Sequence, residues 1–204
     1  PPVDCAPPYA PTTETDLNAA VACVNASGAG VHTITLAADI ELSAPVMPLN
    51  NPDATEIVLD GNGHTLDGNR KGTVLRIAAG TAARIRDLTL TGGQGSSGPT
   101  GNWAGGIYNQ GDLTLENSTL VGNIAARGGG IVNHGDGLAA ELTLLRSTLS
   151  GNVATGIGGG ILNTAAGGGA ATARLENSTL TGNYAAAGGG GLYNEANNGN
   201  ATAT

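Results

Sequence analysis

Aromatic residues are scarce in this chain of 204 residues. It has no phenylalanine, one tryptophan and four tyrosines. A compact globular core is normally built around such rings, so we expect a narrow core of aliphatic side chains. No apolar run approaches the roughly 18 residues of a membrane span, so no crossing helix is predicted. Glycine is abundant, at 35 residues, but it follows no three-residue period, which excludes collagen.

Charge is also scarce, and positive charge most of all. Charged residues make up 12% of the chain, and eight basic residues stand against 16 acidic ones, for a net charge of −8. Such a surface repels phosphate, so nucleic acid and anionic membranes are poor candidate partners. Apolar residues make up 40% of the chain, which is too many for an acidic disordered tail.

Only two cysteines are present, Cys5 and Cys23. Two cysteines in a short segment of an exported chain predict one disulfide, and two unpaired thiols are the alternative. The chain begins with Pro1 and Pro2 rather than methionine, which suggests a removed upstream segment such as a signal peptide, although the design of an expressed fragment would give the same start.

Internal repeats decide the architecture. Residues 113–123 read LTLENSTLVGN, residues 142–152 read LTLLRSTLSGN, residues 173–183 read ARLENSTLTGN, and residues 83–93 are a weaker copy. Their aligned threonines are 30, 29 and 31 residues apart, at Thr89, Thr119, Thr148 and Thr179. A second block follows each first block and ends at Asn109 (GGIYN), Asn133 (GGIVN), Asn163 (GGILN) and Asn194 (GGLYN).

Each repeat holds three short runs that alternate with a period of two, as half-buried strands do, separated by Gly/Asn corners. This pattern predicts an all-β fold, a parallel β-helix, and right-handed crossovers are the rule for such connections. Three inward columns follow from the alternation. They are Ile85, Leu115, Leu144 and Leu175; Leu90, Leu120, Leu149 and Leu180; and Ile107, Ile131, Ile161 and Leu192.

Asparagines recur at two corners of the repeat. They are Asn123, Asn152 and Asn183 at one corner, and Asn109, Asn133, Asn163 and Asn194 at the other. Asparagine tolerates left-handed backbone at tight corners. Stacked asparagine amides can also bond from coil to coil. We interpret both sets as structural ladders rather than as ligands.

The first third of the chain is less regular. Residues 12–26 predict a short amphipathic helix, with Leu17, Val21 and Val24 on one face. Because a solenoid must shield the open end of its core, we expect residues 1–30 to be a leader and helical cap and residues 31–204 to be the coils. The ending NNGNATAT shows no cap, so we expect further coils, a partner or self-association at that end.

The GGGIxN and NSTLxGN blocks resemble repeats of the polymorphic outer-membrane-protein type, over roughly residues 12–204. The leader, from TDLNAAVACVNA to IVLDGNGHTLDG, is similar to the segment that opens many such β-helix proteins. This resemblance implies a right-handed parallel β-helix in a secreted or surface-attached bacterial protein with a role in display, adhesion or envelope structure. It supplies no catalytic residue.

The strongest candidates for catalysis are Asp60, His64 and Asp67, in DGNGHTLDG. Paired carboxylates serve glycoside hydrolysis, and a polysaccharide-active enzyme is the second functional hypothesis. The alternative is that the two aspartates bond the backbone of a tight turn, and we favour it because no second carboxylate cluster is evident on neighbouring coils.

Five of the eight basic residues gather within 17 positions and form the only anion-attracting feature. They are Arg70, Lys71, Arg76, Arg84 and Arg86. Charge balance against Glu56, Asp60, Asp67 and Asp87 is the alternative and favoured explanation. Trp103, in a glycine-rich loop, could contact a ligand, but a local packing role is the more common one.

A possible partner stripe alternates with the third inward column. It consists of Tyr108, Val132, Leu162 and Tyr193. Strict alternation points these side chains outward, and an exposed apolar stripe marks an interface. The alternatives are that the glycine-rich stretches fold over the stripe or that the strand twists it inward.

Outward threonines of the Thr-x-Thr type, such as Thr89 and Thr91, suggest ice binding as a third hypothesis, which Val121 and Ser150 weaken. His32, His64 and His134 make no metal-ligand spacing, and the glycine runs lack a phosphate-loop lysine, so we expect no metal and no cofactor. The sequence therefore favours a non-enzymatic, extracellular structural or adhesive module with a protein or cell-surface partner.

Overall fold

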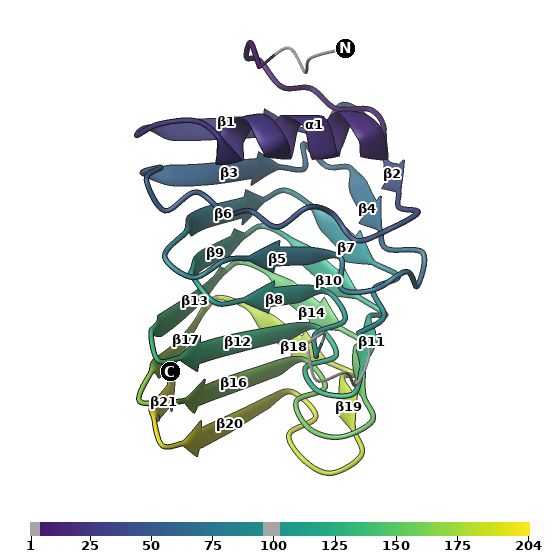
Figure 1. Ribbon diagram of the computed structural model, residues 1–204. Helices are drawn as coiled ribbons and strands as arrows, with labels where there is room; N and C mark the ends of the chain where they lie inside the picture. The colour runs from purple at the N-terminus through teal and green to yellow at the C-terminus, as the bar shows by residue number, and fades with distance from the viewer. Residues whose placement is uncertain (1–4, 96–102) are drawn as a thin grey trace.

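Parallel strands stack into the walls of a solenoid (Figure 1). The computed structural model describes residues 5–95 and 103–204. The seven-stranded sheet contains β1 (Val31–Thr35), β3 (Glu56–Asp60), β6 (Ala82–Arg86), β9 (Asp112–Glu116), β13 (Ala139–Leu145), β17 (Ala170–Glu176) and β21 (Asn200–Ala203). The six-stranded sheet contains β2 (Ile40–Glu41), β4 (Thr65–Asp67), β7 (Thr89–Thr91), β10 (Thr119–Val121), β14 (Thr148–Ser150) and β18 (Thr179–Thr181). The predicted parallel β-helix with a short N-terminal helix is confirmed.

Two further sheets complete the walls. The five-stranded sheet contains β5 (Leu75–Ile77), β8 (Ile107–Asn109), β12 (Ile131–Asp136), β16 (Ile161–Ala166) and β20 (Leu192–Asn197). The three-stranded sheet contains β11 (Ile124–Ala125), β15 (Val153–Ala154) and β19 (Tyr184–Ala185). The prediction of three strands in each coil was therefore incomplete, because the later coils add a two-residue strand before the glycine run.

The three predicted inward columns are confirmed. In the column of the six-stranded sheet, Leu120 pairs in register with Leu90 and with Leu149, and all three are fully buried. The other two columns keep the same register, with Leu115 between Ile85 and Leu144, and Ile131 between Ile107 and Ile161. Stacked aliphatic side chains therefore fill the bore, and no aromatic ring is needed there.

The asparagine ladders are confirmed, but one of the two reasons given for them is wrong. Nδ2 of Asn123 donates to Oδ1 of Asn152 at 3.0 Å, and Nδ2 of Asn152 donates to Oδ1 of Asn183 at 3.0 Å. Asn109 donates in the same way to Asn133 at 2.7 Å. None of these ladder residues is among the described non-glycine residues with positive φ, so amide bonding rather than left-handed backbone explains them.

The left-handed corner lies elsewhere in the repeat. It is formed by equivalent residues of four coils, whose φ angles lie between 46° and 50°: Asp87, Asn117, Arg146 and Asn177. The residue after it begins a hydroxyl ladder, in which the backbone N–H of Ser118 donates to Oγ of Ser147 at 3.2 Å. The Asn-Ser-Thr motif thus supplies a turn residue, a ladder hydroxyl and an outward strand residue in succession.

Helix α1 (Glu14–Asn25) lies across the first coil and covers the end of the bore (Figure 1). Oγ1 of Thr13 caps its first turn by accepting a hydrogen bond from the backbone N–H of Asp16 at 3.2 Å. Leu17, Val21 and Val24 are buried in the main core, as predicted. At the opposite end, the last residues of the three columns are only partly buried.

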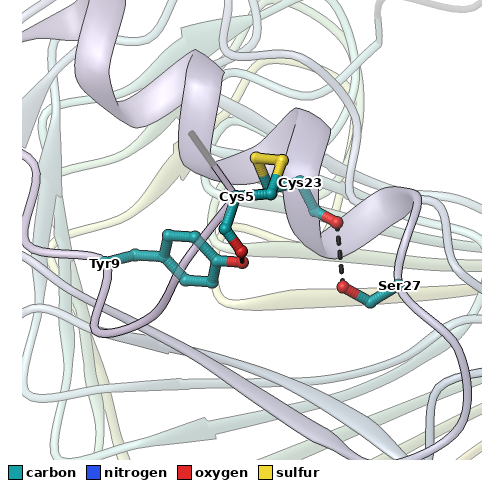
Figure 2. Close-up of a disulfide and its surroundings, with 4 residues drawn as sticks. All are labelled: Cys5, Tyr9, Cys23 and Ser27. Atoms are coloured by element: carbon teal, nitrogen blue, oxygen red, sulfur yellow. Dashed lines mark hydrogen bonds between the residues drawn. A yellow bond between two sulfur atoms is a disulfide. The ribbon is translucent and has the colours of Figure 1, made fainter. Parts of the chain in front are cut away.

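A disulfide joins the leader to this helix. Cys5 and Cys23 are bonded, with Cα atoms 5.3 Å apart, so the alternative of two free thiols is wrong. Figure 2 shows the bond beside Tyr9, whose hydroxyl donates to the carbonyl of Cys5 at 3.0 Å. The carbonyl of Tyr9 accepts from the backbone N–H of Thr35 at 3.0 Å, so the leader runs alongside β1.

The first prediction tests the column assignment. Leu149→Ala removes a fully buried side chain between two packed neighbours, so we expect the free energy of unfolding to fall by roughly 2–5 kcal/mol, as measured by urea denaturation. Thr148→Ala, on the outward side of the same strand, is the matched control and should change it by less than about 0.5 kcal/mol. Equal denaturation midpoints for Leu149→Ala and the parent would contradict the column.

The second prediction concerns the disulfide. It closes a loop with a sequence separation of 18, which corresponds to about 3 kcal/mol of stability in the chain-entropy model. Reduction should therefore lower the denaturation midpoint of the parent. The double variant Cys5→Ala/Cys23→Ala should start at that lower midpoint and be insensitive to reductant. A parent whose midpoint does not change on reduction would show that the bond contributes little.

Candidate functional site

The three candidate residues for carbohydrate cleavage, Asp60, His64 and Asp67, do not form one group. Asp60 is the last residue of β3 in the seven-stranded sheet, whereas Asp67 ends β4 in the six-stranded sheet. Asp60 accepts a hydrogen bond from the backbone N–H of Asn62 at 2.9 Å and pairs with Arg86 at 2.7 Å. This geometry supports the alternative in which Asp60 serves a tight turn.

Two carboxylates from the preceding coil, which the sequence analysis missed, accompany His64 and Asp67. Nδ1 of His64 lies 3.2 Å from Oδ1 of Asp39, and Glu41 pairs in register with Asp67. Asp39, Glu41 and Asp67 line a hollow of about 400 Å³ together with Thr65. The signal was present in the sequence DIEL, because residues 39 and 41 share one face of a strand.

These carboxylates are engaged by the turns around them. Oδ1 of Asp67 accepts from the backbone N–H of Asn69 at 2.8 Å, and Nδ2 of Asn69 donates to Glu41 at 2.7 Å. The hydrogen bond from the backbone N–H of Thr65 is the main cause that lowers the pKa of Asp39, followed by the contact with the imidazole. A carboxyl with a lowered pKa is ionised at neutral pH and is a poor proton donor.

No metal centre can be assigned to this region or to any other described one. Within residues 5–95 and 103–204, no three side chains of His, Cys, Asp and Glu gather in a way that could hold a metal ion. The acids of the hollow bond the turns around them, through the backbone N–H groups of Thr65 and Asn69.

The five basic residues do not form one patch. Arg84 lies on β6 and pairs with Glu56 at 3.1 Å and Glu116 at 3.2 Å, and hydrogen bonding to Glu56 is the main cause that raises the pKa of Arg84. Arg86, also on β6, pairs with Asp60. For these two arginines the structure supports the charge-balance explanation.

The other three basic residues lie on different parts of the coil. Arg70 and Lys71 are exposed in the turn that follows β4. Arg76 is on β5, in the five-stranded sheet, and its guanidinium carbon lies 5.1 Å from the centroid of the Tyr108 ring. Residues that are close in sequence are dispersed here because the chain turns a corner of the coil between them.

The apolar stripe points away from the bore as predicted, but it is not an exposed surface. Tyr108 is 7% exposed, and Val132 and Leu162 are fully buried, while Tyr193 is partly buried. They form a second hydrophobic cluster with Ala104, Trp103 and Ile157. The expectation of an exposed stripe is therefore wrong, and the alternative, in which glycine-rich loops cover it, is the one observed.

Glycine is required where these loops pass the stripe. Gly128 and Gly158 have φ angles of +59° and +68°, in the left-handed region. A Cβ atom at Gly128 would lie 2.3 Å from Cγ2 of Val132, and one at Gly158 would lie 2.8 Å from Cβ of Leu162. The glycine runs therefore bring the covering loops into direct contact with the stripe.

The same face holds a polar cluster that the sequence analysis missed. The hydroxyl of Tyr108 and Nδ1 of His134 are 2.6 Å apart, and His134 is 8% exposed. The ring of Trp103 lies 5.3 Å from that of His134, and Arg127 lies over Trp103 at 5.2 Å. Trp103 is thus the local packing residue that the alternative interpretation described.

Alternation along β12, in the five-stranded sheet, could have revealed this cluster. His134 follows Val132 by two positions, and its register partners in the next two coils are Thr164 and Glu195. Glu195 pairs with Arg127, and the hydroxyl of Thr164 bonds the same carboxylate at 3.3 Å. The polar groups at one outward position of successive coils therefore fasten the loop that carries Arg127.

The third prediction concerns pH. Burial is the largest cause that lowers the pKa of His134, nearby Arg127 lowers it further, and Asp136 opposes the shift. Because the folded pKa lies below the value of about 6.5 in an unfolded chain, the stability is fully present above pH 6.5 and is lost as the pH falls through the folded pKa. The fluorescence of Trp103, the only tryptophan, should report this loss in urea titrations between pH 7.5 and 5.

The control is His134→Gln, which keeps an acceptor for Tyr108 but cannot titrate in this range. The two remaining histidines are common to both proteins, so the difference between their pH profiles isolates His134. Parallel profiles for parent and variant would contradict the prediction.

Comparison with known families gives one match. The family model described as a putative pectate lyase-like adhesive domain matches residues 20–126, which are 107 of the 204 residues. The matched region includes the second half of α1, the first coils, the DGNGHTLDG turn and the beginning of the covered stripe. Searches of curated proteins and of solved structures gave no match.

The match agrees with the observed architecture. The solenoid is built from parallel sheets with a helix at its N-terminal end, and no helix in the described parts of the chain is long and apolar enough to cross a membrane. The family model spans half of the chain, so this protein belongs to the family of putative pectate lyase-like adhesive domains.

Proposed function

We propose that the chain is an extracellular adhesive module that presents a rigid solenoid surface to a protein or cell-surface partner. The observation that carries the proposal is the match of residues 20–126 to an adhesive domain. The resemblance of the repeats to those of polymorphic outer-membrane proteins points the same way, and a bacterial, surface-attached origin is part of this hypothesis.

The disulfide supports export. The Cys5–Cys23 disulfide is of the kind that persists in oxidising compartments. It links the leader to the helix that covers the core, so the end of the solenoid is protected by a covalent bond as well as by packing. A module that works outside the cell is stabilised when the end of its core is closed by a covalent bond in this way.

The bonding of the carboxylates supports a non-catalytic role. Asp60 is held by Arg86 and by a turn, and Asp67 by a second turn. General acid catalysis needs a carboxyl with a raised pKa beside a second carboxylate, whereas hydrogen bonding to the backbone N–H of Thr65 and to His64 lowers the pKa of Asp39. A polysaccharide-active enzyme remains the competing hypothesis, and the experiment below includes it.

The outward face of the six-stranded sheet is regular but not uniform. Thr119 pairs in register with Thr89 and Thr148, and these threonines are partly exposed. At the second outward position, Val121 and Ser150 interrupt the threonines, as noted for the ice-binding hypothesis. This face adds a row of partly exposed hydroxyl groups to the proposed adhesive module.

The fourth prediction tests adhesion. Beads that carry the 204-residue protein should be retained, saturably, on at least one of four coatings: fibronectin, mucin, chitin or the protein itself. Beads that carry protein unfolded by heat and reduction are the control and should be washed away. Incubation with polygalacturonate, followed by assay of unsaturated and reducing ends, should show no turnover. Turnover of the polymer, or retention equal to that of the unfolded control on all four coatings, would contradict the proposal.

A further inference from the structure

The negative charge of the chain is concentrated towards its N-terminal end. Residues 1–69 contain nine of the 16 acidic residues and neither lysine nor arginine, whereas all eight basic residues lie between Arg70 and Arg174. The leader, α1 and the first coil are therefore the acidic end of the solenoid. Charge of one sign attracts the opposite sign over about a Debye length, so this end draws cationic groups towards it.

A hollow lies at this acidic end, between the leader and α1. It has a volume of about 300 Å³, and its lining includes Pro8, Tyr9, Pro11, Asp16 and Ala19. Among the described residues that line it, Asp16 alone is charged. We call it the leader hollow. Its volume is at the lower end of the range for ligand sites, which suits one long side chain better than a folded partner surface.

The wall that the leader contributes is held at three points. The disulfide joins Cys5 to α1, and the hydroxyl of Tyr9 donates to the carbonyl of Cys5 at 3.0 Å (Figure 2). The carbonyl of Tyr9 accepts from the backbone N–H of Thr35 at 3.0 Å. The carbonyl of Pro11 accepts from that of Ala37 at 3.0 Å. Because this wall is ordered before a ligand arrives, less entropy is lost on binding.

Two groups of the leader hollow suit a cation. Tyr9 supplies an aromatic ring, whose face attracts positive charge. Asp16 supplies a carboxylate, whose Oδ2 accepts from the hydroxyls of Thr13 at 2.8 Å and Thr12 at 3.4 Å. A carboxylate has about four lone-pair positions, so Oδ1 can accept from a further donor. Glu14 and Asp16 in the first turn of α1 also offset the partial positive charge of the helix N-terminus.

The rest of the lining suits the aliphatic stem of a basic side chain. Pro8, Pro11 and Ala19 present carbon atoms and no polar side-chain group. Lysine and arginine lay their methylene groups along such a surface and keep the charged head beside polar groups. A bare cation would leave this apolar surface uncovered, and the hydroxyls of a sugar would find few partners on it. The lining therefore favours a basic side chain over either.

We propose that the leader hollow binds a lysine or arginine side chain from a peptide segment of the partner. The methylene groups of that side chain lie along Pro8, Pro11 and Ala19, and its charged head lies beside Oδ1 of Asp16 and the ring of Tyr9. The surrounding acidic end attracts the segment before it docks. This inference rests on the proposed adhesive function and names the chemistry that the module recognises.

The fifth prediction uses a defined probe, the rhodamine-labelled peptide Ala-Leu-Arg-Leu-Ala with both ends blocked, in anisotropy titrations of the 204-residue protein. We expect saturable binding that weakens at least tenfold when citrulline, which has the shape of arginine without its charge, replaces the arginine. We expect the same loss in Asp16→Asn. Binding of the citrulline probe as tight as that of the arginine probe would overturn the proposal.

A matched control separates the hollow from the general charge of the acidic end. Asp53→Asn removes the same charge from an exposed turn that does not line the hollow, so it should bind the arginine probe within twofold of the parent. Equal losses of affinity in Asp16→Asn and Asp53→Asn would overturn the site, because the charge of the whole end would then account for the binding.

A second pair of variants guards against damage to the first turn of α1. Ala19→Arg places a basic side chain three residues after Asp16 on the same helix, where it can pair with that carboxylate and fill the hollow. It should bind the probe at least tenfold more weakly than the parent. Ala19→Gln adds a neutral side chain of similar length and should lose less than threefold. Ala19→Arg that binds like the parent would contradict the assignment.

Two further measurements identify the source of the ligand and its role. Spermidine that displaces the probe as effectively as the unlabelled peptide would replace the peptide assignment with a free polyamine. Beads that carry Ala19→Arg should lose retention on the coating that holds the parent beads. If they are retained like the parent, the leader hollow is not the adhesive contact and this inference fails, although the adhesive function stands. Loss of retention by the parent beads on all four coatings would instead defeat the proposed function.

Discussion

Parallel pairing of equivalent strands places each side chain about 4.8 Å from its counterpart in the next coil. A residue type that recurs at one position of the repeat therefore stacks as a column, and its side chains have to interact favourably with others of the same type. Aliphatic residues such as Leu120 and Leu149 meet this condition by dispersion and exclusion of water. Asparagine meets it because one amide carries both a donor and an acceptor, as Asn123 and Asn152 show. Ionised groups do not, so Arg84 stands between acids of the neighbouring coils.

The parts of the fold that obey this condition could be predicted from the sequence. A period near 30 and an alternation of two assign Leu149 to the bore without any knowledge of the corners. The cross-section of the coil could not be obtained in this way. The direction of Tyr108 was predicted correctly, but its burial depends on Trp103 and on loops that belong to other coils. The roles of Asn117 and Asn123 could not be told apart from the sequence either. Asn117 is a turn residue with positive φ, whereas Asn123 is a ladder residue whose amide bonds Asn152.

The candidate site was less predictable than the fold because sequence proximity and spatial proximity separate at every corner. Arg76 and Arg84 are eight positions apart but lie on different sheets. Asp39 and His64 are 25 positions apart but touch. The DGNGHTLDG motif is the clearest case, since its two aspartates lie on two sheets and its nearest additional acids come from the preceding coil. Motifs in a solenoid therefore have to be read across coils before chemistry is assigned.

Irregular coils present surface features that are not repeated from coil to coil. In the later coils, Val132 and Leu162 repeat one environment, and the glycine runs close over it. In the first coil, Pro45 and Pro48 have no backbone N–H to donate, and the segment joins β5 only through a bridge between Leu49 and Ile77. Asn18 and Asn25 of the helix also bond this segment. Two hollows lined by Arg76 lie beside this segment. Residues 20–126, which match the adhesive family, contain this irregular region together with the repeat copies at residues 83–93 and 113–123. A partner that distinguishes one coil from the next has to recognise such a departure from the repeat, because the repeat itself presents the same groups many times.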